Sequence, residues 1–285
     1  HTIVDDLNKK VIGRKIIGVW FDCKKIIKKP RPEDFEKIIK GKKILRAHRR
    51  AKNILINLSS GYMMLVHQKM TGHLLVGKWK IIGGKPVVIE SKSIASDPYN
   101  RFVHVIFYLS DGNMLALSDM RKFAKIILGK KEDVENLPEL KELGPEPLDK
   151  NLKFNEFKNI IYKKTGKIKQ VLMDPKVISG IGNIYSDDIL WLAKINPFKP
   201  ANKISEVKLR ELFKAIRTIL NKALKLRGSS ISDFRDTSGK KGGYGNVMLA
   251  YQREGEKCLR NDGWVIVRKK IGGRSAHFCS ICQTL

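Results

Sequence analysis

The chain has 285 residues, of which 42% are hydrophobic, so it can bury the cores of one large or two ordinary domains and is not wholly disordered. Its 57 Lys and Arg residues exceed its 28 Asp and Glu residues, giving a formal charge of +29. This excess favours a polyanionic partner, with nucleic acid first and an acidic membrane surface second. No apolar run approaches the about 20 residues of a membrane span, and the first residues lack the pattern of a signal peptide.

The first half of the chain reads mainly as short strands after a brief opening helix near residues 5–10. In Asn53–Leu58, apolar side chains alternate, which places Ile54 and Ile56 on one face of a strand. Two further apolar runs, Val103–Leu109 and 114–117, flank an Asp-Gly pair, which is a strong signal for a hairpin. Several short strands joined by turns predict a β-sandwich or barrel, and we assign it to residues 1–130.

An acidic, proline-bearing stretch separates this half from the next. It covers residues 131–148 and ends in LGPEPL, in contrast to the basic character of the rest of the chain. Such a shift in composition is typical of a linker between domains.

The second half is predicted to be helical over residues 149–240. Apolar residues recur at helical spacing after Ser205, a suitable N-cap, and the pattern closes at Gly228. Shorter helices are expected over 167–173 and 184–193. The sequence between these two helices, GIGNIY at 180–185, exposes backbone N–H groups at a helix start, which suits a phosphate, although such glycines often only make a tight turn.

The cysteines point to a metal site within residues 241–285, beside a strand expected at 265–271. Cys279 and Cys282 form a C-x-x-C pair, and Cys258 precedes them. Asp262 is the candidate for a fourth ligand, so we predict one structural Zn²⁺; the alternative is a hairpin without metal. Cys23 is expected to be a small buried apolar residue. Clustered cysteines of this kind, without a disulfide pattern, also indicate a reducing, cytoplasmic location.

Taken together, six segments make the chain similar to the bacterial formamidopyrimidine-DNA glycosylases, the family shared with endonuclease VIII. The segments are HRRAK at 48–52, HQKMTG at 67–72, DMRKF at 119–123, LGPEPL at 143–148, GIGNIY at 180–185 and GGRSAHFC at 272–279. The resemblance spans essentially the whole chain. It implies an α+β multidomain fold, with an N-terminal β-sandwich, a helix–two-turn–helix domain and a C-terminal zinc-finger-like β-hairpin.

The resemblance also implies the activity. Family members excise oxidised purines such as 8-oxoguanine from duplex DNA and then cut the strand at the abasic site, acting as bifunctional glycosylase and lyase. The partner implied is double-stranded DNA with oxidised or abasic sites, bound by a monomer. The target base must leave the stack, which costs a few kcal/mol, and protein side chains fill the hole.

Individual roles carry over to matching positions. Lys52 and Arg274 match catalytic residues that contact phosphates around the lesion. Positions matching DNA-binding residues include the inserting triad, the helix–two-turn–helix asparagine, the place of a histidine before a strand, and the lesion-capping loop. Met70, Arg121 and Phe123 match the inserting triad, and Asn183 matches the asparagine. Phe102 stands at the place of the histidine, with His104 two residues later, and Tyr244 lies in the segment of the lesion-capping loop.

The family's nucleophile is an N-terminal proline amine, followed by a glutamate that donates a proton, in a Pro-Glu-Leu-Pro-Glu-Val run. The sequence printed here starts at His1, which aligns just after that run. We expect truncation to explain this and the chain as printed to be inactive. Alternatives are an endonuclease VIII-like enzyme for oxidised pyrimidines and a non-catalytic protein that binds damaged DNA. A basic RNA-binding protein would fit the charge but not the six ordered segments.

Overall fold

The structure is a computed structural model that describes residues 1–231 and 234–285. Contacts within the chain divide it into two compact units, which are described separately. The first unit contains His1–Lys141 and Leu226–Gly245, and the second contains Glu142–Lys225 and Asn246–Leu285. The domain boundaries drawn from the sequence alone stay a prediction.

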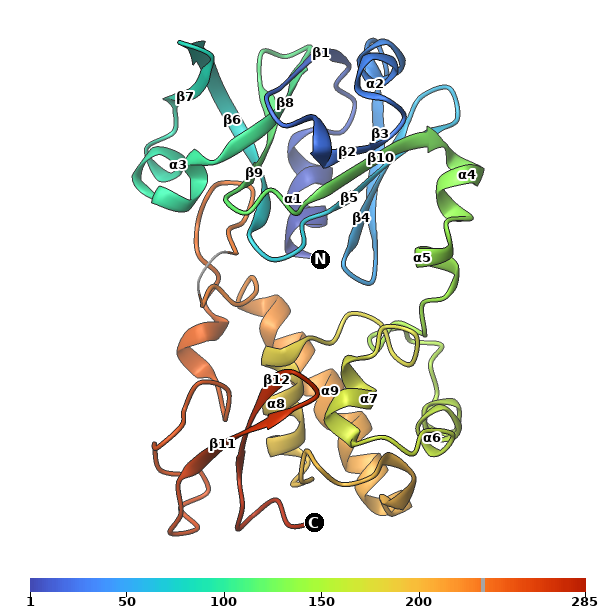
Figure 1. Cartoon of the computed structure of the whole chain (residues 1–285), viewed down its shortest axis with the longest axis vertical. Coiled ribbons are helices and arrows are strands. Elements are labelled where there is room, and N and C mark those ends of the chain that lie inside the picture. The colour runs from blue at the N-terminus through green and yellow to red at the C-terminus, as the bar shows by residue number, and fades with distance from the viewer. Residues whose placement is uncertain (232–233) are drawn as a thin grey trace. The chain divides into compact units, whose positions relative to one another are not determined.

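The first unit is built around two five-stranded sheets (Figure 1). One sheet has the order β1-β8-β9-β6-β7 and the other the order β2-β10-β5-β4-β3. The strands are β1 (Ile16–Phe21), β2 (Ile27–Lys29), β3 (Ile44–Arg50), β4 (Asn53–Leu58), β5 (Tyr62–His67), β6 (Gly72–Ile82), β7 (Lys85–Glu90), β8 (Val103–Leu109), β9 (Met114–Asp119) and β10 (Lys125–Lys130). The helical elements are α1 (Thr2–Lys10), η1 (Lys24–Ile26), α2 (Pro32–Ile39), α3 (Lys92–Ser96), η2 (Pro98–Arg101), α4 (Lys131–Glu135), α5 (Pro138–Lys141) and η4 (Tyr244–Val247, which begins in this unit).

One apolar core joins the two sheets and the helices α1 and α2. Ile54 and Ile56 of β4 lie in this core with Phe107 of β8, as the alternating pattern predicts. The predicted hairpin is also confirmed, because β8 pairs with β9 in antiparallel register. Its turn uses Gly112 at φ +81°, a backbone conformation that glycine adopts without steric cost. The β-sandwich predicted from the sequence is therefore present.

One expectation is corrected in this unit. Cys23 is half-buried at the margin of the core instead of fully buried, because it lies in a loop outside the strands. The acidic stretch contains two short helices, α4 and α5, and its role as a linker stays a prediction.

The segment after helix α9 returns to the first unit. Arg227 donates to Asp6 of α1 at 2.8 Å and to Asp236 at 2.8 Å. The hydroxyl of Thr237 also donates to Asp6, at 3.0 Å. The bonds to Asp6 connect residues more than two hundred positions apart in sequence, so the segment after α9 packs on α1 within the first unit.

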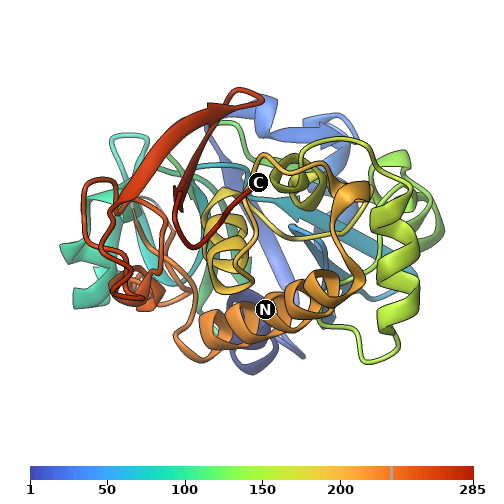
Figure 2. The same ribbon diagram turned by 90° about the horizontal axis from the view of Figure 1, so that it is seen from below.

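The second unit contains the helices and the C-terminal hairpin. Its elements are α6 (Phe154–Tyr162), α7 (Ile168–Met173), α8 (Asn183–Leu192), η3 (Ala201–Lys203), α9 (Glu206–Lys225), β11 (Ile266–Ile271) and β12 (Arg274–Cys279). The long helix α9 packs against α8 (Figure 2), with Leu209, Leu212 and Ile216 fully buried. The predicted apolar stripe is therefore core. No helix in the described ranges is long and apolar enough to cross a membrane.

Candidate nucleic-acid interface and metal site

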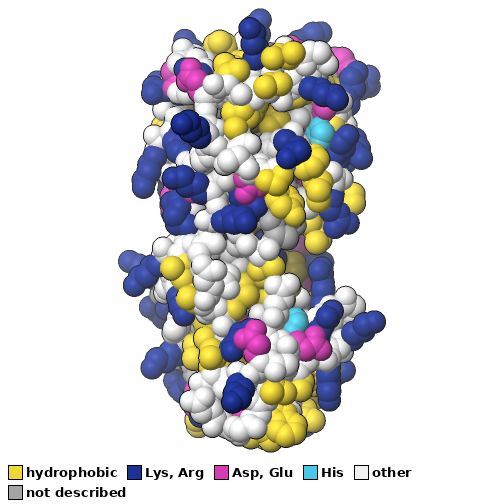
Figure 3. Space-filling model, turned by 90° about the vertical axis from the view of Figure 1, so that its left-hand side faces the viewer, with side chains coloured by type: hydrophobic (Ala, Val, Ile, Leu, Met, Phe, Trp, Pro, Cys, Tyr) yellow, Lys and Arg dark blue, Asp and Glu magenta, His cyan; other side chains and the backbone are white. Residues whose placement is uncertain are grey.

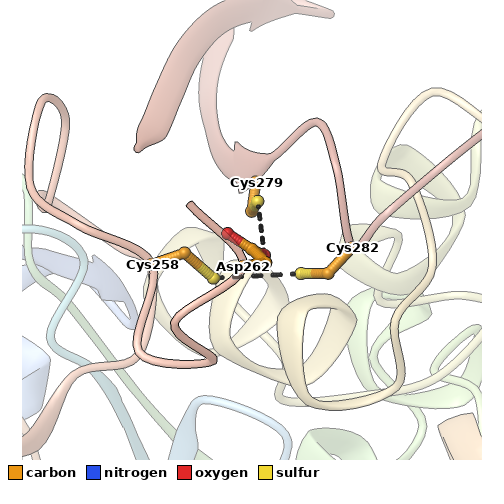
Figure 4. Close-up of side chains that lie close together, drawn as sticks. All are labelled: Cys258, Asp262, Cys279 and Cys282. Atoms are coloured by element: carbon orange, nitrogen blue, oxygen red, sulfur yellow. Dashed lines mark hydrogen bonds between the residues drawn. The ribbon is translucent and has the colours of Figure 1, made fainter. Parts of the chain in front are cut away.

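Four metal-binding side chains meet at the C-terminal hairpin, as the sequence predicts (Figure 4). Ligand atoms of Cys258, Asp262, Cys279 and Cys282 all lie within 4.8 Å of one another. Cys279 ends β12, and Cys282 follows it by one turn. Cys258 and Asp262 come from the loop before β11, where Asn261 at φ +53° donates from its backbone to the Cys258 carbonyl at 3.0 Å.

The chemistry of this cluster fits a metal ion. The sulfur atoms of Cys258 and Cys282 are 3.9 Å apart, close to the about 3.8 Å that tetrahedral zinc–thiolate geometry requires. The Cys279 thiol donates to Asp262 at 3.1 Å, and this bond holds the pKa of Asp262 below its usual value. Burial raises the pKa of Cys282 to about 12, although Arg260 at 2.9 Å opposes that shift. A bound cation would compensate the charge of the thiolates, so the residues present can hold a metal ion.

Two exposed apolar tips project from neighbouring loops of the first unit. Met70, between β5 and β6, is 59% exposed, and Phe123, between β9 and β10, is 50% exposed. Each has a lysine directly before it in a left-handed backbone conformation, Lys69 at φ +56° and Lys122 at φ +57°. The Arg121 guanidinium lies 4.6 Å from the centre of the Phe123 ring. Both tips line one open pocket, so the structure brings the predicted inserting residues together.

A buried carboxylate that the sequence reasoning missed connects these two loops. Asp119 is fully buried at the end of β9 and accepts from the backbone of Ala124 at 2.7 Å and of Arg121 at 3.3 Å. It also accepts from the hydroxyl of Thr71, which in turn accepts from the Arg121 backbone at 3.1 Å. Asp119 and Thr71 therefore fix the loop of Met70 to the loop of Phe123.

His67, at the end of β5, holds the backbone of the loop that carries Met70. Its Nδ1 atom accepts from the Lys69 backbone at 2.9 Å. Burial lowers the pKa of His67 to about 4, with the charges of Lys69, Lys125 and Lys52 adding to the effect. At neutral pH the imidazole is therefore uncharged, and it can act as an acceptor. The histidine stands in a segment used for the resemblance, which is the signal that could have identified it.

The remaining predicted residues of the first unit lie in different environments. Lys52 is exposed in the turn between β3 and β4. Phe102 is half-buried before β8, whereas His104 is only 7% exposed and contacts Asp22 at 2.7 Å through Nδ1. Tyr244 is fully buried, so a DNA contact by its ring would require a rearrangement. DNA contacts by Phe102, His104 and Tyr244 stay predictions.

In the second unit, the predicted glycine turn opens helix α8. Asn183 is the first residue of that helix, directly after Gly182. Its side-chain oxygen is buried, and among the described residues it has no hydrogen-bond partner. Such an atom is costly to leave unsatisfied.

Arg274 is exposed at the tip of the hairpin, and a buried ionic cluster lies beneath it. Lys169 of α7 contacts Asp187 of α8 and donates to the Ser275 carbonyl at 2.7 Å. His277 of β12 contacts the other oxygen of Asp187 at 2.9 Å through Nδ1 and at 3.0 Å through its backbone. Lys169 and Asp187 were not anticipated, because nothing in a helical apolar pattern shows that a charged residue inside it will find a buried partner.

Basic side chains cover much of the surface. On the face drawn in Figure 3, Lys and Arg side chains are widely spread and acidic ones are few, as the charge of +29 requires. Such a surface attracts a polyanion over distances comparable to the Debye length.

A β-sandwich, a helix–two-turn–helix and a hairpin with a metal-binding cysteine cluster define a class of DNA-repair proteins. Residues 1–126 match the family model "Formamidopyrimidine-DNA glycosylase N-terminal domain", and residues 143–235 match the model of its H2TH domain. The chain therefore belongs to the formamidopyrimidine-DNA glycosylase family.

Individual relatives agree along nearly the whole chain. The formamidopyrimidine-DNA glycosylase of Pelotomaculum thermopropionicum is 38% identical, covering 99% of this chain and 96% of that protein. The formamidopyrimidine-DNA glycosylase of Herpetosiphon aurantiacus is 35% identical, and the match covers 99% of this chain and 97% of that protein. The solved structure of Lactococcus lactis Fpg with DNA containing an abasic site has a TM-score of 0.86 at 30% identity, covering 100% of this chain and 97% of that one. A complex of Lactococcus lactis Fpg with Fapy-dG DNA has a TM-score of 0.85, also at 30% identity, covering 100% and 98%.

Proposed function

We propose that this protein is a base-excision-repair DNA glycosylase with abasic-site lyase activity, which removes oxidised purines such as 8-oxoguanine from duplex DNA. The observation that carries the proposal is the pair of exposed tips, Met70 and Phe123, held on one pocket beside Arg121. Exposed apolar side chains of this size are costly in water unless they meet a partner. The relatives in complex with abasic and Fapy-dG DNA supply the class of partner.

In this proposal the tips replace the base that has left the stack. Met70 and Phe123 fill the apolar space between base pairs, and Arg121 donates to the orphaned cytosine. Because Arg121 also lies over the Phe123 ring, the two side chains enter the duplex as one body. The insertion offsets part of the few kcal/mol that unstacking costs.

The chemistry requires an amine nucleophile. The amine of a proline standing before His1 would attack C1′ and form a Schiff base, while the base leaves with a proton from the following glutamate. An N-terminal amine suits this step because its pKa is about 8, so part of it is neutral at pH 7. Lys52 and Arg274 would hold phosphates beside the lesion, and Asn183 would bind the backbone by donating from its side-chain amide N–H group.

The metal proposed for the cysteine cluster is zinc. Three thiolates and one carboxylate form a closed set of four ligands, which is typical of a structural site. The ion would fix the hairpin that carries Arg274. Metal analysis should find close to one zinc per chain, and a strong chelator should remove it together with DNA binding. Protein without zinc that binds DNA normally would contradict this assignment.

The catalytic proposal is tested by comparing two polypeptides on 8-oxoguanine DNA. The chain from His1 should bind DNA containing an abasic-site analogue but give neither strand cleavage nor a borohydride-trapped complex, since six extended residues displace its amine by up to about 20 Å. The chain preceded by Pro-Glu-Leu-Pro-Glu-Val should do both, and Lys52→Ala in that chain should impair excision. Cleavage and trapping by the chain from His1 would refute the proline amine as nucleophile.

A further inference from the structure

A pocket lined by lysines lies beside the exposed tips. It has a volume of about 560 Å³ and belongs entirely to the first unit. Its lining residues are Lys25, Lys28, Lys69, Met70, Lys122, Phe123 and Lys125. They come from three segments that are far apart in sequence, namely η1 with β2, the β5–β6 loop, and the β9–β10 loop with the start of β10.

The pocket carries a net positive charge. Lys125 contacts Glu139, but among the described residues no carboxylate forms an ion pair with any of the four other lysines. All four of them are exposed. Like charges held this close repel one another, so the pocket favours a ligand with several negative charges.

From this arrangement we propose that the lysine pocket binds phosphates of the DNA strand opposite the lesion. The inference rests on the proposed function. Lys122 lies between Arg121, which would donate to the orphaned base, and Phe123, so the pocket is next to the strand that contains that base. A DNA strand carries one charge per about 3.4 Å of helix axis, so a pocket of this size meets more than one phosphate.

The lysines of the pocket have a task distinct from that of the residues assigned to the damaged strand. Lys52, Asn183 and Arg274 would hold phosphates near the lesion, on the strand that is cut. Lysines on the opposite strand would hold the duplex in place while the tips enter it. Because they act as point charges on phosphates, they should add affinity without sequence preference.

The test uses Lys25→Gln/Lys28→Gln and DNA with an abasic-site analogue opposite cytosine. The double variant should bind several-fold more weakly, and its slope of log affinity against log salt should fall by about 2, since each lost phosphate contact reduces it by about 1. The matched control, Lys80→Gln/Lys85→Gln, removes the same charge from exposed positions on β6 and β7 and should leave the slope unchanged.

Methylphosphonate links, which are uncharged, identify the strand. Placed on the strand opposite the lesion, they should weaken binding by the unmodified protein but have little further effect on the double variant. The proposal would be overturned if the double variant lost sensitivity to uncharged links on the damaged strand instead. It would also be overturned if the salt slope of the double variant equalled that of the control variant. Excision of 8-oxoguanine by the protein with an unaltered pocket, preceded by Pro-Glu-Leu-Pro-Glu-Val, reports separately on the proposed function.

Discussion

Replacing Phe123 with alanine tests whether this ring serves DNA binding or the fold. Full burial of a phenylalanine side chain contributes about 1.5–3 kcal/mol, and Phe123 is 50% exposed, so about 1 kcal/mol of folding free energy is at stake. Loss of the contact with Arg121 adds about 0.5 kcal/mol at an exposed site. We therefore expect Phe123→Ala to lower the free energy of unfolding by only about 1–1.5 kcal/mol.

The effect on DNA should be larger than the effect on stability. Removing an aromatic ring that stacks on a base costs about 1–3 kcal/mol, which is about a 5- to 150-fold loss of affinity. The loss should concern DNA with an abasic-site analogue and leave most of the affinity for undamaged duplex. Fluorescence anisotropy with both duplexes at one salt concentration measures the ratio, and urea unfolding measures stability.

Phe107→Ala is the matched control. Phe107 is fully buried in the sandwich core, so the same change there should cost about 3–5 kcal/mol of stability. Its preference for the abasic site should persist in the folded protein. If Phe123→Ala instead destabilises the protein as much as Phe107→Ala does, or keeps the full preference for damaged DNA, the assignment of Phe123 as an inserting residue is wrong.

Other changes test the residues that position the site. Asp119→Asn should cost about 2–3 kcal/mol, because the amide cannot accept all the bonds of the carboxylate, and should reduce the preference for abasic DNA, whereas Thr71→Ser, which keeps the hydroxyl, should change little. Asp187→Asn should lower the unfolding free energy by about 3–5 kcal/mol in a denaturant titration, since it leaves Lys169 charged and buried; a cost under 1 kcal/mol would contradict this cluster. His67 is neutral when folded but gains a proton when unfolded below pH 6.5, so the unfolding free energy should fall, by on the order of 2–3 kcal/mol, as the pH drops from 6.5 to about 4. His67→Asn, which keeps an acceptor but does not titrate, should flatten that pH dependence, and an unchanged slope would exclude His67 as its source.

Elements that depend on local patterns could be predicted from the sequence. The stripe of α9, the hairpin at Gly112 and the C-x-x-C pair each follow from residues close together in the chain. Asp262 could also be proposed as a ligand, because it lies four residues after Cys258 and carries a carboxylate, which zinc accepts as a ligand.

Features that depend on distant partners could not be predicted. A charged side chain can be buried only if an oppositely charged partner lies beside it. The partner of Lys169 is Asp187, which is 18 residues away on another helix. Asp119 meets Thr71 across 48 residues, and Arg227 meets Asp6 across 221. Before the fold is known, such residues are indistinguishable from the many exposed charges of this chain.

Excision rates on two substrates distinguish an enzyme for oxidised purines from an enzyme for oxidised pyrimidines. The chain preceded by Pro-Glu-Leu-Pro-Glu-Val is incubated in excess with duplexes that contain either 8-oxoguanine opposite cytosine or an oxidised pyrimidine, under identical salt. We expect faster release of 8-oxoguanine, followed by strand cleavage at the same site. Faster release of the oxidised pyrimidine would identify an endonuclease VIII-like enzyme, and release of neither base would contradict glycosylase activity altogether.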